Sequence, residues 1–130
     1  MDSVPFSAVD HVQLAMPAGH EDRARAFFAG VLGMRELQKP EDLRARGGAW
    51  FASGDVQVHL GVDPDFRPAT KAHVALLCTR FVELCARLED AGHPVIVAGT
   101  FEDGALHAYV DDPFGNRLEL IAPPPQEERA

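Results

Sequence analysis

Apolar and polar residues alternate along several short stretches of the chain and recur at helical spacing in two others. Residues 8–16 alternate with period two, which predicts a strand with one partly polar face. Residues 21–32 carry apolar side chains at helical spacing, and Gly33 is placed to end that helix. Three further strands follow in the predicted order, at 34–38, 49–53 and 56–62.

The second half of the chain repeats this order of elements after a linker, 63–70, that is rich in proline and turn-forming residues. Its predicted elements are a strand at 72–78, a helix at 81–91 and strands at 94–97, 105–110 and 117–121. Each half therefore reads β-α-β-β-β. The sequence predicts one α+β domain made of two modules, about 8–63 and 70–122, followed by a mobile tail at 123–130.

Short sequences echo one another between the halves. Asp10-His11-Val12 answers to Ala72-His73-Val74, and Val58-His59-Leu60 answers to Leu118-Glu119-Leu120. The two separations agree to within two residues, so the repeat covers a whole folding unit. Each echo places a side chain that can bind metal among apolar neighbours.

Strand periodicity assigns these side chains to faces, because successive side chains of a strand point to opposite sides. His11, His59, His73 and Glu119 each lie opposite a strongly apolar face that can pack on the predicted helices. If the two sheets curl toward each other, the four side chains point into one concavity. The predicted architecture is thus an open, curled mixed sheet around a central cavity.

Imidazole and carboxylate together suit Zn, Fe, Ni, Mn or Co. Two histidines and one carboxylate would leave coordination positions open for substrate, as a catalytic site requires. The plain alternative for any one histidine is a hydrogen-bonded structural role. Cys78 and Cys85 are expected to be free, buried apolar residues rather than thiolate ligands.

Composition limits the partners. The net charge of −8, with no basic patch, argues against nucleic-acid binding and against an anionic membrane surface. No apolar run approaches the roughly 20 residues of a membrane span. The first residues lack the basic and apolar regions of a signal peptide, so a cytoplasmic protein is expected.

Four stretches of the sequence resemble those of a known family. The pieces that carry the resemblance are 10–14, 31–34, 73–76 and above all 109–120, Tyr-Val-Asp-Asp-Pro-Phe-Gly-Asn-Arg-Leu-Glu-Leu. They are similar to the vicinal oxygen chelate superfamily, which groups glyoxalases, bleomycin-resistance proteins and extradiol dioxygenases. The resemblance covers about residues 8–122. It implies paired βαβββ modules that form an open barrel around a divalent metal ion.

The resemblance also implies roles for single residues. His11, His73 and Glu119 match the three metal positions that metal-dependent members share. His59 matches a fourth position, where glyoxalase I usually carries glutamate and methylmalonyl-CoA epimerase glutamine. Because His59 removes one carboxylate base, lactoylglutathione lyase activity is not favoured. Tyr109 matches a tyrosine that contacts substrate in fosfomycin-resistance proteins.

The sequence thus predicts a metal-dependent enzyme for a small molecule: a lyase, isomerase, dioxygenase or thiol transferase. Glu119 and Tyr109 are the candidate catalytic residues. The candidate substrate-binding residues are Gln13, Phe51, Gln57, His107, Tyr109 and Arg117. A homodimer is expected, with the site either within one chain or shared between two. The alternative is a metal-free protein that binds or sequesters a drug, as bleomycin-resistance members do; the acidic charge would suit a cationic drug.

Overall fold

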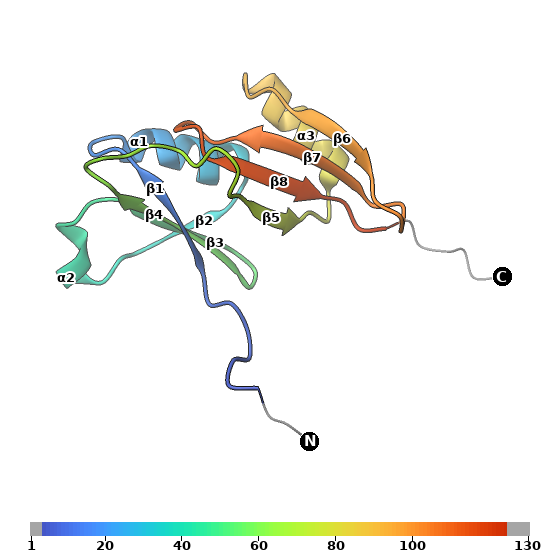
Figure 1. The fold of residues 1–130 in the computed structure, drawn as a ribbon. Helices are drawn as coiled ribbons and strands as arrows, with labels where there is room; N and C mark the ends of the chain where they lie inside the picture. Colours follow the sequence, from blue (N-terminus) through green and yellow to red (C-terminus); the bar gives the residue numbers. More distant parts are fainter. Residues whose placement is uncertain (1–3, 125–130) are drawn as a thin grey trace.

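Two four-stranded mixed sheets form the framework of the protein in a computed structural model that describes residues 4–124 (Figure 1). The first sheet has the order β1-β4-β3-β2, and the second has the equivalent order β5-β8-β7-β6. The strands of the first are β1 (Val12–Met16), β2 (Arg35–Leu37), β3 (Ala49–Ser53) and β4 (Val56–Val62). Those of the second are β5 (Val74–Leu77), β6 (Ile96–Thr100), β7 (Leu106–Asp111) and β8 (Arg117–Ile121).

The two sheets are built in the same way, which confirms the predicted repeat. In each, the first strand pairs in parallel with the last, and the remaining neighbours are antiparallel. Both sheets stay open, as predicted for this α+β fold. The predicted strand at 8–16 begins only at Val12, and the strand predicted at 94–97 lies at Ile96–Thr100. Residues 125–130 of the predicted tail lie outside the described residues.

Two helical segments fill the predicted helical positions. The first starts as α1 (Glu21–Ala24) and continues as the π-helical η1 (Arg25–Val31), where Leu32 N donates to Phe27 O at 2.9 Å, five residues back. The second is α3 (Phe81–Asp90). A short helix, α2 (Glu41–Arg44), was not predicted, because a single polar turn has no apolar period. No helix within residues 4–124 is long and apolar enough to cross a membrane.

The helices pack on the sheet faces that the alternating pattern predicts to be apolar. On the first sheet, the ring of Phe51 stacks on Phe28 of η1 with centroids 5.3 Å apart. On the second, Leu118 and Leu120 are fully buried in the same core cluster as Leu88 of α3. One core therefore serves both modules, and the sheet faces that carry His59 and Glu119 lie on the other side.

Polar contacts also fasten the two modules together. The Asn116 amide Nδ2 donates to Ala15 O at 2.8 Å, and Arg23 donates to Pro113 O at 3.0 Å. Asn116 sits in the turn between β7 and β8, where Asp112 accepts its backbone N–H at 2.8 Å. The tight 112–116 turn is thus both a local cap and a link between the modules.

The two cysteines are free, as expected, but only half-buried. Cys78 follows β5 and Cys85 lies on α3, and both pack against the core cluster. Burial raises the pKa of both thiols. They therefore behave as small apolar residues rather than as reactive thiolates.

Candidate metal and substrate site

Three aromatic rings form a stack on the outer face of the first sheet. The centroids of Trp50 and His59 lie 4.1 Å apart with planes 7° from parallel, and those of His59 and His11 lie 4.0 Å apart at 14°. Trp50 and His59 are paired directly across β3 and β4. The stack leaves His59 only 5% exposed, and its Nε2 lies 3.1 Å from Gln57 Oε1.

Burial is the main cause that lowers the pKa of His59, and the charge of His11 lowers it further. A neutral imidazole is the form that can bind a metal ion. The nearly parallel rings of His11 and His59, however, hold their nitrogen lone pairs in separate planes. The stack therefore does not aim both rings at one point.

His11, which lies one residue before β1, is oriented by its neighbour. Its Nδ1 is 2.8 Å from Asp10 Oδ1, so the ring donates Nδ1–H to the carboxylate. That bond leaves Nε2 as the free nitrogen. A carboxylate that fixes the ring and tautomer in this way is the usual support for a metal-binding histidine.

On the second sheet, two histidines hold the Glu119 carboxylate. His73 Nε2 is 2.9 Å from Oε1, and His107 Nδ1 is 3.1 Å from Oε2. Glu119 is 7% exposed. A carboxylate with both oxygens occupied has a fixed orientation, which is the condition for a well-formed ligand.

His73 faces oxygen acceptors on both sides. Its Nδ1 lies 2.9 Å from the Lys71 carbonyl, and its Nε2 faces Glu119. The bond to Lys71 and then the bond to Glu119 raise the pKa of His73. Since the carbonyl can only accept, Nδ1 carries a proton, and the Nε2–carboxylate pair needs a second proton or another cation between the two groups. This donor set fits a divalent metal ion.

Other candidate residues surround this carboxylate. The His107 ring stacks on Phe101 with centroids 4.1 Å apart, and Tyr109 meets His73 edge-on at 5.7 Å. The Arg117 guanidinium lies over the Tyr109 ring, 5.1 Å from its centroid. The structure thus brings together five of the sequence-predicted site residues on the second sheet.

The candidate ligands of one chain therefore form two separate clusters, which we call half-sites. His11 and His59 meet on the first sheet, and His73 and Glu119 meet on the second, each on the face turned away from the shared core. Within residues 4–124, no group of three or more His, Cys, Asp or Glu side chains is arranged to hold a metal ion.

Phe51 corrects one expectation. It is fully buried in the core beneath η1, so it does not line a substrate cavity. Side chains alternate along β3, and Trp50 takes the outer face instead. The alternation of Trp50 and Phe51 predicts only that one of them faces the core, and the position of η1 decides which one.

A cavity of about 250 Å³ lies beside the first half-site. Gln13, Trp50 and Gly61 form its floor, and all three share the outer face with His11 and His59. The segment between β2 and β3 covers it with Lys39 and Arg46. Gln13, a candidate substrate-binding residue, thus lines a cavity together with two basic residues that were not among the candidates.

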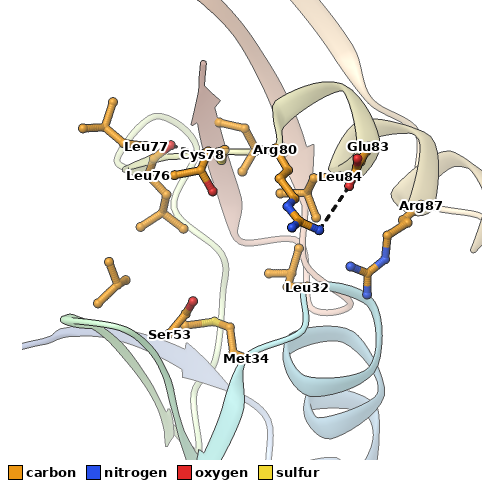
Figure 2. Close-up of a pocket in the computed structure, with 13 residues that line it drawn as sticks. Leu32, Met34, Ser53, Leu76, Leu77, Cys78, Arg80, Glu83, Leu84 and Arg87 are labelled. Atoms are coloured by element: carbon orange, nitrogen blue, oxygen red, sulfur yellow. Dashed lines mark hydrogen bonds and ion pairs between the residues drawn. The ribbon is translucent and has the colours of Figure 1, made fainter. Parts of the chain in front are cut away.

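A second cavity, of about 260 Å³, lies on the core side of the sheets (Figure 2). Leu32 and Met34 border it from one module, and Cys78 and Arg87 from the other. None of the predicted metal or catalytic residues lines it. It is therefore separate from the candidate site.

Two open βαβββ modules that share one core define a glyoxalase-like fold. The chain belongs to the glyoxalase/bleomycin resistance protein/dioxygenase superfamily, whose family model matches residues 8–120. A solved glyoxalase family protein from Bacillus anthracis is 41% identical, with a TM-score of 0.87 over 94% of this chain and 98% of that one.

More distant structures share the fold alone. A genomically encoded fosfomycin resistance protein from Listeria monocytogenes is 15% identical, with a TM-score of 0.72 over 91% of this chain and 94% of that one. A lactoylglutathione lyase from Agrobacterium tumefaciens is 22% identical, with a TM-score of 0.67 over 92% and 96%. No curated protein matches this chain significantly.

Proposed function

We propose that this protein is a metal-dependent enzyme that acts on a small molecule carrying two neighbouring oxygen atoms. His11, His73 and Glu119 hold one divalent ion, of Zn, Ni, Fe, Mn or Co. When bound, the ion acts as a Lewis acid toward negative charge that develops on substrate oxygen. The reaction class is that of a lyase, isomerase, dioxygenase or thiol transferase.

The observation that carries the proposal is the tautomer of the two histidines. Asp10 accepts a hydrogen bond from Nδ1–H of His11, and the Lys71 carbonyl accepts one from Nδ1–H of His73. In both rings Nε2 is therefore the nitrogen that would bind a metal ion: that of His11 has no bond within residues 4–124, and that of His73 points at Glu119. The Glu119 carboxylate is buried and lies 2.9 Å from the His73 nitrogen.

The surrounding side chains supply binding and proton transfer. Glu119 would accept a proton from the substrate or return one, and the Tyr109 hydroxyl, which lies in the same half-site, would donate a hydrogen bond to the substrate. Gln13 and Gln57 orient the substrate from the first sheet, and Arg117 holds an anionic group of the substrate from the second. His59 would be either a fourth ligand or an uncharged residue that lines the site. Its stacking between His11 and Trp50 supports the second role.

The complete site forms between two copies of the chain. The half-sites of one chain lie on faces that point away from its core, so another copy must supply the missing half. Among the described residues, β1 and β5 each pair on one side only, which leaves two open strand edges beside the half-sites. Exposed apolar side chains accompany these edges, with Val9 75% and Leu77 77% exposed.

Metal analysis tests the proposal. Protein purified with neither chelator nor histidine tag is expected to carry about one divalent ion per chain, or to gain thermal stability when Ni, Co, Mn, Zn or Fe(II) is added. His73→Ala should abolish both effects. If the wild-type protein carries no metal and shows no thermal shift with any of these ions, the proposal is refuted.

The second candidate is a metal-free binding protein of the bleomycin-resistance type. Its support is the net charge of −8, which favours a cationic ligand. The His73→Ala variant also separates the two functions. Loss of metal with retained ligand binding would indicate a binding protein, whereas loss of turnover would indicate an enzyme.

A further inference from the structure

The cavity beside the first half-site is basic in an otherwise acidic protein. Lys39 and Arg46 are its two charged lining residues, and no carboxylate lines it. The chain as a whole carries a net charge of −8. A local excess of positive charge in a concave site attracts anions against the field of the whole protein.

Both basic groups keep unused hydrogen-bond donors. The Lys39 ammonium donates to the Gly47 carbonyl, which fixes the side chain and leaves two of its three donors free. No side-chain hydrogen bond or ion pair within residues 4–124 uses the Arg46 guanidinium. Gly47, which accepts the Lys39 bond, lines the same cavity, and the next residue is anchored because Gly48 N donates to Glu21 Oε2 at 3.1 Å.

The cavity lies on the same face of the first sheet as His11 and His59. Gln13 follows His11 on the same face, and Gly61 follows His59. The Lys39 charge is close enough to His59 to contribute to its lowered pKa. A molecule whose oxygens reach His11 therefore extends along this face toward Lys39 and Arg46.

We infer that this cavity binds an anionic group of the substrate, a carboxylate, phosphate or phosphonate, through Lys39 and Arg46. The inference rests on the proposed function for the direction of the substrate. The substrate would then be a small anion: two of its oxygens reach the metal site, and its charged group lies farther along the sheet face, at Lys39 and Arg46. At Gly61 the Gln13 amide lies directly over the strand, so an added Cβ would have to displace that amide.

The test uses metal-free protein, so that it does not depend on metal binding. Trp50 is the only tryptophan of the chain and lines the cavity, so its indole N–H signal in a ¹H–¹⁵N spectrum reports on this site. Inorganic phosphate is titrated at constant ionic strength, and glycerol serves as the neutral probe. The wild-type signal should shift saturably with phosphate and not with glycerol.

Matched variants identify the residues. Lys39→Met and Arg46→Met should each weaken phosphate binding roughly tenfold, as expected for the loss of one charge-assisted hydrogen bond. Arg35→Met removes the same charge from β2, away from the cavity, and should bind like the wild type. If Lys39→Met disturbs the fold by losing its bond to Gly47, Arg46→Met still carries the test, because its guanidinium holds no such bond.

Equal affinity in all four proteins, or a shift that never saturates, would overturn the inference. A cobalt titration of the same proteins separates this outcome from failure of the proposed function. Normal cobalt binding with no phosphate site would refute only the basic cavity. Phosphate binding with no cobalt site would refute only the metal enzyme.

Discussion

His73 lies one residue before β5 and Glu119 lies on β8, the parallel neighbour of β5, and His73 Nε2 is 2.9 Å from Glu119 Oε1. The two residues are far apart in sequence, and each of them has a further bond that fixes its side chain. The Lys71 carbonyl fixes the far nitrogen of His73, and His107 occupies the second oxygen of Glu119. Half of the proposed metal site is thus formed before any ion binds.

His107 should set the affinity of this half-site by orienting Glu119. His107→Ala frees one carboxylate oxygen, and metal affinity is expected to fall about 10–100-fold, as for other groups that support a ligand. His107→Asn can still donate an N–H and should recover most of the loss. Calorimetric titration with Zn or Co measures both, and an unchanged affinity in the Ala variant would contradict the assigned role.

His59 should prove dispensable for metal binding. Its ring lies parallel to His11 and between His11 and Trp50, so His59→Phe keeps the stack while removing both nitrogens. The variant is expected to bind Co with nearly wild-type affinity, whereas His73→Phe should not. A loss of about 100-fold in His59→Phe, the size expected for a removed ligand or a vital support, would make His59 a ligand.

His59 should make the stability of the metal-free protein depend on pH, and the His59→Phe variant serves as the comparison. The folded state holds the pKa of His59 below its unfolded value of about 6.5, chiefly through burial. The unfolded chain then binds the proton more readily than the folded protein. The contribution of neutral His59 to the free energy of unfolding is therefore present above the unfolded pKa, and it is lost as the pH falls through the lower, folded pKa.

The melting temperature of the wild type should therefore fall relative to His59→Phe between about pH 7.5 and pH 5.5. The raised pKa of His73 acts in the opposite direction in both proteins and cancels from the difference. A difference that is constant with pH, or of the opposite sign, would show that His59 titrates normally in the folded protein.

Asn116 should stabilise the contact between the modules. Its side chain is bonded to Ala15 O and to Asp112 Oδ2, each at 2.8 Å, and the residue is 9% exposed. Asn116→Ala leaves buried acceptors without a partner, so the free energy of unfolding should fall by about 1–3 kcal/mol. Chemical denaturation measures this, with exposed Thr70→Ala as the control. A loss no larger than that of the control would contradict it.

Much of the fold follows from the sequence because both modules bury one face of each sheet. The period-two pattern correctly predicts that Val58, Leu60, Leu118 and Leu120 face the core and that His59 and Glu119 face away. The pattern fails where tertiary packing decides. Alternation alone does not distinguish Phe51 from Trp50, and only the position of η1 places Phe51 in the core.

The sequence indicates the candidate site residues but not how they are assembled. Repeat spacing brings His11, His59, His73 and Glu119 to equivalent strands, yet it says nothing of how two sheets of one chain face each other. That arrangement is held by the shared core and by the Asn116 and Arg23 contacts between the modules. Lys39 and Arg46 carried no periodic signal, because they lie in an irregular segment around a single helical turn.

The central claim is that His11 of one copy meets His73 and Glu119 of another. It is tested most directly by co-expressing chains with two different non-histidine tags and measuring the metal content of the purified heterodimer. A His11→Ala chain paired with a Glu119→Gln chain regains one complete site, and the expected content is one ion per dimer. A His11→Ala, Glu119→Gln double variant paired with a wild-type chain leaves no complete site, and no ion is expected. The reverse result, an ion only in the second heterodimer, would place the site within one chain and contradict the account.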